Sequence, residues 1–220
     1  TSIRKRLQNI FGGSVMKTIE KWQRYELTLH GPELKGEYSQ VDLTAKIQNG
    51  ANIFTVRGFY AGGNDYKVRY MPQEEGLWQI TVESNIKEIN GQTDSFQCVP
   101  ASKGNHGPVV VENQTHFAYS DGTPYLPFGT TAYAWTLQDD SVQQQTLKTL
   151  KENKFNKVRM TVFPKYFNYN TTEPKQYPYE GKPKHVTGTF QKSSWMVDPE
   201  DSGFNFGRFN PEYFDHLENC

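Results

Sequence analysis

The chain has 220 residues with a formal net charge of zero, 35% hydrophobic residues and 14% aromatic residues. This length is enough for a buried core and indicates one large domain or two smaller ones. The balanced charge gives no reason to expect a nucleic acid as partner, because phosphate binding depends on a clustered excess of Lys and Arg. A polar chain rich in aromatic rings instead suits ligands that combine hydroxyl groups with flat apolar faces, such as sugars.

The cysteines and the hydropathy pattern exclude several other classes of protein. Cys98 and Cys220 lie far apart without metal-ligand spacing, so we predict neither a disulfide framework nor a metal site, and no cofactor. No apolar run approaches the roughly 20 residues that a membrane-spanning helix needs, and no signal-peptide core is present. We therefore expect a cytoplasmic protein without a membrane partner, and the oligomeric state is left open.

Residues 1–15 differ from the rest of the chain, because they are basic, end in Gly-Gly-Ser and precede Met16. Apolar residues within this segment can line one face of a short helix, which would make it a membrane-surface or partner-binding arm. An isolated helix of this length is marginal in water. We therefore interpret residues 1–15 as a non-native or disordered leader.

From Trp22 to Val99, apolar and polar residues alternate almost throughout, as in Tyr25, Leu27 and Leu29. This period of two is typical of half-buried antiparallel strands. Turn-forming pairs such as Asn49-Gly50 separate the alternating segments. The pattern predicts an all-β, immunoglobulin-like sandwich over residues 16–103, with Trp22 and Trp78 in its core.

A Pro- and Gly-rich segment at residues 99–109 marks the expected domain boundary. Beyond it we predict a hairpin and then a strand that ends in aromatic residues at 130–138. A helix with Val142, Leu147 and Leu150 as its buried stripe follows, and then a strand at 157–163. Strand, helix and strand in this order predict a parallel pair.

A second helix is predicted after Asn210, with Asn210 as N-cap, Pro211 in the first helical position and Phe209 packed on Phe214. Two such units can neither close a barrel nor complete a doubly wound sheet. The sequence therefore predicts a multi-domain chain, in which residues 104–220 are the incomplete start of an α/β TIM barrel.

The candidate site lies where the two predicted parallel strands end, since ligands of parallel α/β folds bind at the carboxyl ends of strands. The first strand ends through Tyr133 and Trp135, and the second through Arg159 and Phe163, followed by Lys165 and Tyr166. The long loop from residue 164 to residue 208 is rich in aromatic residues, which favours an ordered segment that faces the ligand.

Arg159 is the most specific of these candidates, because a guanidinium group cannot lose its charge and needs a carboxylate or another acceptor. It either orients a catalytic carboxylate or forms a structural ion pair, and position alone favours the catalytic role only slightly. His216 has no metal-ligand partner at helical spacing, and Asp139-Asp140 is a helix start. We interpret both as structural.

Longer phrases of the sequence resemble a known family. The first resembles the N-terminal immunoglobulin-like domain of a group of bacterial proteins assigned as glycoside hydrolases, through "WQRYELTLHGP", "FTVRGFYAGGNDYKVRYMPQEEGLWQITVESN" and "GNHGPVVV". The second resembles the opening of their apiosidase-like (β/α)8 barrel, through "FAYSDGTPYLPFGTTAYAWT", "TLKTLKENKFNKVRMTVFPKYF" and "FNFGRFNPEYFDHLE". The resemblance runs from about Ile19 to the last residue.

The resemblance implies an enzyme that hydrolyses the O-glycosyl bonds of plant or bacterial oligosaccharides with two carboxylates, with retention as the expected outcome. Those carboxylates belong to later strands, so we expect no catalytic residue in this chain and no activity of this fragment alone. By resemblance, Arg159 matches an arginine that contacts the nucleophile, and Tyr133 and Trp135 match an aromatic wall. The alternative is a non-catalytic carbohydrate- or protein-binding sandwich, which predicts exposed, coplanar Trp or Tyr side chains.

Overall fold

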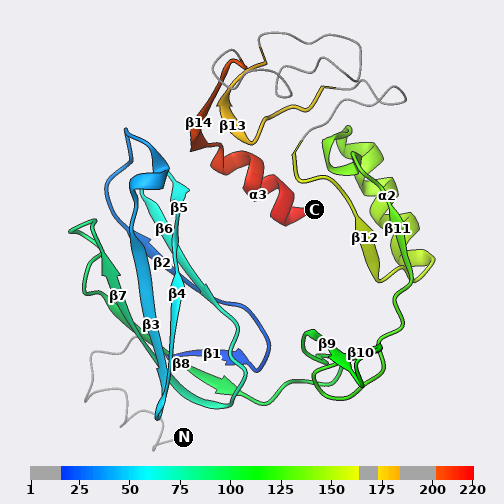
Figure 1. The fold of residues 1–220 in the computed structure, drawn as a ribbon, viewed down its shortest axis with the longest axis horizontal. Coiled ribbons are helices and arrows are strands. Elements are labelled where there is room, and N and C mark those ends of the chain that lie inside the picture. Colours follow the sequence, from blue (N-terminus) through cyan, green and yellow to red (C-terminus); the bar gives the residue numbers. More distant parts are fainter. Residues whose placement is uncertain (1–15, 164–172, 184–201) are drawn as a thin grey trace, which may run out of the picture. The chain divides into compact units, whose positions relative to one another are not determined.

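The computed structural model describes residues 16–163, 173–183 and 202–220 (Figure 1). The strands are β1 (Lys17–Glu20), β2 (Tyr25–His30), β3 (Leu43–Asn49), β4 (Asn52–Arg57), β5 (Phe59–Gly62), β6 (Asp65–Tyr70), β7 (Gly76–Ser84), β8 (Thr93–Val99), β9 (Val109–Glu112), β10 (His116–Tyr119), β11 (Gly129–Thr131), β12 (Lys157–Arg159), β13 (Tyr179–Gly181) and β14 (Phe204–Phe209). The helices are the α-helices α2 (Asp140–Glu152) and α3 (Pro211–Asn219) and the 3-10 helices η2 (Tyr38–Gln40) and η3 (Trp135–Leu137).

These strands form several small sheets. The largest has five strands in the order β1-β8-β7-β3-β4, and a second has the order β2-β6-β5. Within the five-stranded sheet only β1 and β8 run parallel, whereas β7 pairs antiparallel with both β8 and β3. The remaining sheets are strand pairs: β9 with β10 and β13 with β14 are antiparallel, and β11 with β12 is parallel.

The chain divides into two compact units. The first comprises Thr1–Gly31, Val41–Phe59 and Tyr66–Pro124, and the second comprises Pro32–Gln40, Tyr60–Asp65 and Tyr125–Cys220. The second unit therefore contains two short segments from the first third of the sequence in addition to the whole C-terminal part. The domain boundaries that the sequence indicates stay predictions.

The core of the first unit lies between its sheets. The alternating residues of β2, β3 and β7 are buried as the sequence predicts. The Tyr25 ring of β2 stacks on the Phe96 ring of β8 with centroids 4.3 Å apart, so the two sheets meet through aromatic side chains. Trp78 is 1% exposed in this core. Trp22 is not part of it, because it is half-buried in the turn after β1 and has a positive φ of 67°.

The fold class predicted from the sequence is wrong. The described residues form mostly small β-sheets with two α-helices, and no closed barrel is present among them. The parallel pair β11 and β12 flanks α2, but each strand has three residues and the pair forms a sheet of its own. The next strand pair along the chain, β13 and β14, is antiparallel and separate. A barrel requires a continuous sheet that closes on itself, and these strand pairs do not supply one.

The two α-helices of the second unit differ in how well the sequence predicted them. In α2, Val142 is 47% exposed and Gln143 is buried, contrary to the expected stripe, whereas Leu147 and Leu150 are half-buried. For α3 the prediction is confirmed: Asn210 is the N-cap, its side chain accepts a hydrogen bond from the Glu212 N–H, and proline follows it. The predicted contact between Phe209 and Phe214 is present, with ring centroids 6.0 Å apart.

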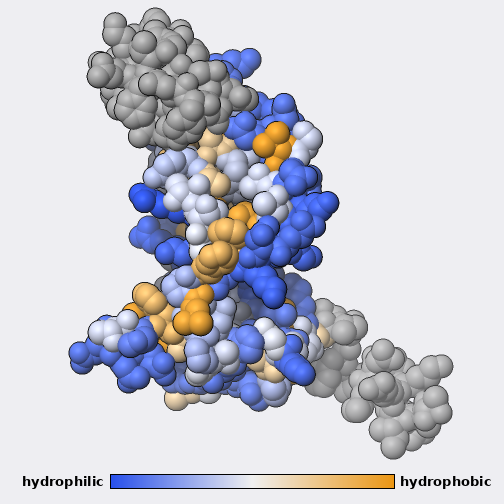
Figure 2. Space-filling model, turned by 90° about the vertical axis from the view of Figure 1, so that its right-hand side faces the viewer, coloured by the Kyte–Doolittle hydropathy of each residue, from blue (hydrophilic) through white to orange (hydrophobic). Residues whose placement is uncertain are grey.

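The segment predicted as one loop from residue 164 to residue 208 contains β13 and most of β14 in its described part, whereas residues 164–172 and 184–201 lie outside the described residues. None of the helices that the structure describes is long and apolar enough to cross a membrane. On the face drawn in Figure 2 most residues are hydrophilic, and apolar side chains gather in a few places. Among the residues that the structure describes, the most exposed large apolar one is Leu126, at 80%.

Candidate functional site

The ends of β11 and β12 bring two of the predicted site residues together. The guanidinium carbon of Arg159 lies 5.7 Å from the centroid of the Tyr133 ring, which is a cation–π contact. The backbone joins the same two segments, because Ala132 N donates to Arg159 O at 2.9 Å and Thr161 N donates to Tyr133 O at 3.0 Å. Arg159 is exposed and forms no ion pair within the described part of the chain.

Trp135 and Phe163 lie in different environments. Trp135 is 8% exposed, and its indole Nε1 lies 3.1 Å from the sulfur of Met160, so the ring packs inside the second unit. Phe163 is 40% exposed and stacks on Tyr179 with centroids 6.0 Å apart and planes 6° apart. Lys165 and Tyr166 lie outside the described residues. The roles of all six predicted site residues in binding a ligand stay predictions.

A pocket of about 400 Å³ lies in the second unit. Its walls come from η3, the first turn of α2, residues 174–176 and α3. The polar side chains that matter for its chemistry are Thr136, Asp140, Gln143, Lys175, Glu212 and His216. Pockets of this size are within the range that small ligands occupy.

Two pairs of side chains set the charge of the pocket. Lys175 Nζ lies 2.8 Å from Asp140 Oδ1, and this hydrogen bond lowers the pKa of Asp140 and raises that of Lys175. Gln176 Nε2 donates to Glu212 Oε2 at 2.8 Å. Both carboxylates use one oxygen in these contacts, so each keeps a second oxygen that accepts no hydrogen bond from any described residue.

The buried side of the pocket is held by a network around Gln143, which is 6% exposed. Its Nε2 donates to Gln138 O at 2.7 Å and to Thr136 O at 3.2 Å, and its Oε1 accepts from Cys220 Sγ at 3.4 Å. Burial raises the pKa of the Cys220 thiol, which keeps the thiol protonated as a donor. His216 Nε2 lies 3.0 Å from Thr136 O, and since a carbonyl only accepts, this nitrogen carries the proton.

Thr136 supplies the polar atom that this network leaves unsatisfied. The residue is 3% exposed, and its Oγ1 is buried with no hydrogen-bond partner among the described residues. Leaving a buried hydroxyl unpaired costs about 1–3 kcal/mol. A polar molecule that reached this atom from the pocket would remove that cost.

Tyr213 connects α3 to the segment after β12. It is 3% exposed, its hydroxyl donates to Val162 O, and burial raises its pKa to about 12. The hydroxyl therefore stays protonated and acts as a donor at neutral pH. This bond fixes the pocket wall on α3 relative to the strand ends.

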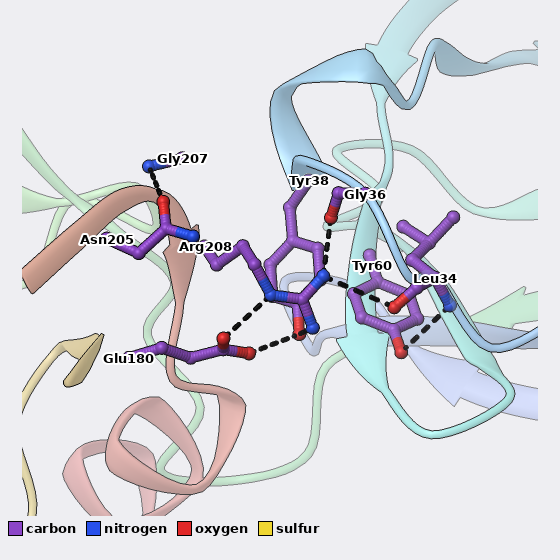
Figure 3. Close-up of polar contacts among 8 residues, drawn as sticks. All are labelled: Leu34, Gly36, Tyr38, Tyr60, Glu180, Asn205, Gly207 and Arg208. Atoms are coloured by element: carbon purple, nitrogen blue, oxygen red, sulfur yellow. Dashed lines mark hydrogen bonds and ion pairs between the residues drawn. The ribbon is translucent and has the colours of Figure 1, made fainter.

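Arg208 of β14 joins β13 to the segment of residues 34–38 within the second unit (Figure 3). Its Nε donates to Glu180 Oε2 at 2.7 Å, one terminal nitrogen donates to Gly36 O at 2.5 Å, and the other donates to the Tyr38 hydroxyl at 3.1 Å. The guanidinium carbon also lies 4.5 Å from the centroid of the Tyr38 ring. Arg208 lowers the pKa of Glu180, and Glu180 raises that of Arg208. With its donors engaged by protein groups, Arg208 is a structural anchor.

Sequence reasoning missed the pocket. The sequence predicts structural roles for His216 and Asp140, and no local pattern marks Gln143, Lys175 or Glu212 as neighbours. The one signal of the pocket in the sequence is Gln143, a polar residue that lies next to Val142 of the expected apolar stripe. No group of three or more His, Cys, Asp or Glu is placed to hold a metal ion in the described residues.

Comparisons with known proteins relate the fold to one class. A family model described as "Domain of unknown function (DUF5060)" matches residues 18–85. The chain is similar to a solved structure described as a "putative glycoside hydrolase" from Bacteroides vulgatus ATCC 8482, with 39% identity over 93% of the chain and a TM-score of 0.80. The chain covers 38% of the length of that protein. The fold is therefore related to that of a protein assigned as a glycoside hydrolase.

Two further solved structures resemble the chain only weakly. The filamin domain of Lin-41 is 13% identical, with a TM-score of 0.32 over 40% of this chain and 89% of its own. A superoxide reductase (neelaredoxin) from Ignicoccus hospitalis is 10% identical, with a TM-score of 0.26 over 38% of this chain and 75% of its own. No protein of curated function matches the chain.

Proposed function

We propose that this chain is part of a longer glycoside hydrolase that cleaves O-glycosyl bonds of plant or bacterial oligosaccharides. The observation that carries this proposal is the 39% identity over 93% of the chain, with a TM-score of 0.80, to the Bacteroides vulgatus protein. The usual mechanism of such enzymes needs two carboxylates, one as acid and base and one as nucleophile or base. In this proposal both belong to the part of the longer protein that this chain does not include.

Within the proposal, the ends of β11 and β12 support the reacting sugar. Arg159 is exposed, always charged and without an ion pair among the described residues. It therefore suits a carboxylate contributed by the rest of the protein, which it would keep ionised and oriented. Tyr133 and Phe163 supply apolar ring faces for the sugar, and Lys165 and Tyr166 stay predicted members of the same site. Trp135 supports this site through its buried contact with Met160, which follows Arg159 in the chain.

The alternative, a non-catalytic binding module, gains no support from a specific contact. It predicts exposed, coplanar Trp or Tyr side chains on a sheet face. Trp78 is 1% exposed and stacks on Phe96 with centroids 6.2 Å apart. The Trp78 ring is therefore buried in the core and is not available to a ligand.

The test is hydrolysis of a panel of aryl glycosides by the full-length protein, with the 220-residue chain assayed in parallel. We expect the full-length protein to release the aryl group from at least one glycoside and the shorter chain to release none. An NMR assay of the anomer first formed distinguishes retention from inversion. A full-length protein that cleaves neither the aryl glycosides nor plant and bacterial oligosaccharides would contradict the proposal.

A further inference from the structure

We propose that the pocket between η3, α2 and α3 is a binding site for one neutral, polyhydroxylated sugar unit, whose hydroxyl groups donate to the carboxylates of Asp140 and Glu212. The assignment of the ligand as a sugar rests on the proposed function, and the chemistry of the pocket indicates the polyhydroxylated class by itself. The pocket volume is about 400 Å³. This volume suits a small ligand.

The charge of the pocket selects the kind of ligand. Asp140 and Glu212 contribute two negative charges, and Lys175, already paired with Asp140 at 2.8 Å, contributes one positive charge. His216 and Tyr213 also line the pocket, and His216 donates its Nε2 proton to Thr136 O. An anionic ligand is disfavoured by this balance, and a cation competes with Lys175 for Asp140.

A neutral ligand with several hydroxyl groups meets these conditions. An ionised carboxylate only accepts hydrogen bonds, and a sugar hydroxyl donates one while still accepting another. Hydrogen bonds to an ionised group are roughly twice as strong as those between neutral groups. The second oxygens of Asp140 and Glu212, which accept nothing from the described residues, are therefore matched by ligand hydroxyl groups.

The buried wall of the pocket adds a second, independent observation. Thr136 Oγ1 is buried without a hydrogen-bond partner in the described part of the chain, and Thr136 lines the pocket. The neighbouring Gln143 amide is fixed by the carbonyl groups of Thr136 and Gln138. The wall is therefore preformed, which is the arrangement expected of a binding site that loses little entropy on binding.

The experiment titrates the 220-residue chain with glucose, galactose, xylose, arabinose and glucuronate, and follows binding by NMR chemical-shift changes. We expect saturable binding of at least one neutral sugar and weaker binding of glucuronate. Glu212→Gln and Asp140→Asn, both of which keep the side-chain shape, are each expected to weaken that binding about fivefold or more. Thr136→Val, which removes the unpaired hydroxyl, is expected to weaken it about threefold.

The matched control is Glu83→Gln, because Glu83 is an exposed carboxylate that pairs with Lys46 Nζ at 2.6 Å on the five-stranded sheet of the first unit. We expect this variant to bind the sugar as the unchanged chain does. Circular dichroism and thermal melting confirm that each variant is folded, and since Asp140 is exposed, its variant keeps the proposal testable even if Thr136→Val does not fold.

Three results would overturn the proposal: no saturable binding of any neutral sugar up to about 100 mM, tighter binding of glucuronate than of the neutral sugars, or unchanged affinity in Glu212→Gln and Asp140→Asn. The experiments distinguish rejection of this binding site from rejection of the proposed hydrolase function. Hydrolysis by the full-length protein without binding in this assay rejects the pocket alone. Binding that depends on Glu212, without hydrolysis by the full-length protein, rejects the proposed function alone.

Discussion

The Nε–H of Arg208 donates to Glu180 Oε2 at 2.7 Å, and this pair ties β14 to β13 directly before the N-cap of α3. Arg208→Ala removes this bond and the donors to Gly36 O and the Tyr38 hydroxyl. We expect the melting temperature of the chain to fall by several degrees. Arg208→Lys should lower it less, because lysine keeps the positive charge but lacks the planar guanidinium fork. Differential scanning fluorimetry measures both variants.

The control for Arg208 is Lys148→Ala. Lys148 forms an exposed pair with Glu152 at 3.9 Å on α2, and such surface pairs contribute little to stability. Equal melting temperatures for Arg208→Ala and Lys148→Ala would mean that the anchor does not stabilise the second unit.

Tyr213→Phe tests the bond between α3 and the end of β12. The substitution leaves the Val162 carbonyl without its donor, and we expect the free energy of unfolding to fall by about 1–3 kcal/mol. Urea denaturation measures the change. Tyr179→Phe serves as control, since the Tyr179 hydroxyl makes no hydrogen bond with the described residues. A loss in the control as large as in Tyr213→Phe would show that the hydrogen bond to Val162 O does not carry the effect.

Gly107→Ala tests the packing of Trp22 in the first unit. Gly107 has a φ of +76°, and a Cβ at this position would lie 2.6 Å from the Trp22 ring. Gly104 has a φ of +97° with nothing within 4 Å of its Cβ position. Both substitutions strain the backbone, so the difference between them isolates the clash with Trp22.

We expect Gly107→Ala to lower the free energy of unfolding by at least about 1 kcal/mol more than Gly104→Ala, as measured by urea denaturation. Losses of the same size would place the whole effect in the backbone and none in the contact with Trp22.

The pair of His106 and Asp121 predicts how the first unit responds to acid. His106 Nδ1 lies 2.7 Å from Asp121 Oδ2, and this hydrogen bond lowers the pKa of Asp121 from 3.8 to about 2. Because the pKa is lower in the folded state, ionised Asp121 favours folding above about pH 4, and this contribution is lost as the pH falls towards about 2.

Asp121→Asn removes the ionisable group, so the melting temperature of the variant is expected to fall less between about pH 4 and about pH 2 than that of the unchanged chain. The effect is small because both side chains are partly exposed. Melting curves at a series of pH values compare the two proteins, and parallel pH profiles would refute the prediction.

Arg159→Met tests the proposed site in the full-length protein. Arg159 is exposed, and its guanidinium carbon lies 5.7 Å from the centroid of the Tyr133 ring. We expect kcat/KM for an aryl glycoside to fall about 10²-fold or more, because the variant removes a fixed charge beside the reacting groups. The melting temperature should change little. A variant with full activity would show that Arg159 does not serve the reaction.

The sequence predicted local structure better than the arrangement of the second unit. Alternation located the strand of Tyr25, and proline after an N-cap asparagine located the start of α3, because both signals depend on neighbours in the chain. The prediction that Trp22 lies in the core was wrong, since its positive φ places it in a turn. The barrel prediction failed because a strand, a helix and a strand specify one parallel pair, and extending that pair requires further strands that no local pattern supplies.

The pocket was not predictable for a related reason. Gln143, Lys175 and Glu212 come from three separate segments, and only the folded chain brings them together. Polar residues on helices and loops are usually solvated, so nothing in their local sequence distinguishes these three from other exposed side chains.

The contact between Arg208 and the Gly36 carbonyl joins residues 172 positions apart. The second unit thus includes Pro32–Gln40 near one end of the chain and β14 near the other. During synthesis at roughly 5–20 residues per second, the early segment leaves the ribosome long before its partner exists. Closing so long a loop also slows folding, since its entropy is lost before the contact is gained. Pro32–Gln40 therefore cannot take its place in the second unit until β14 has been synthesised.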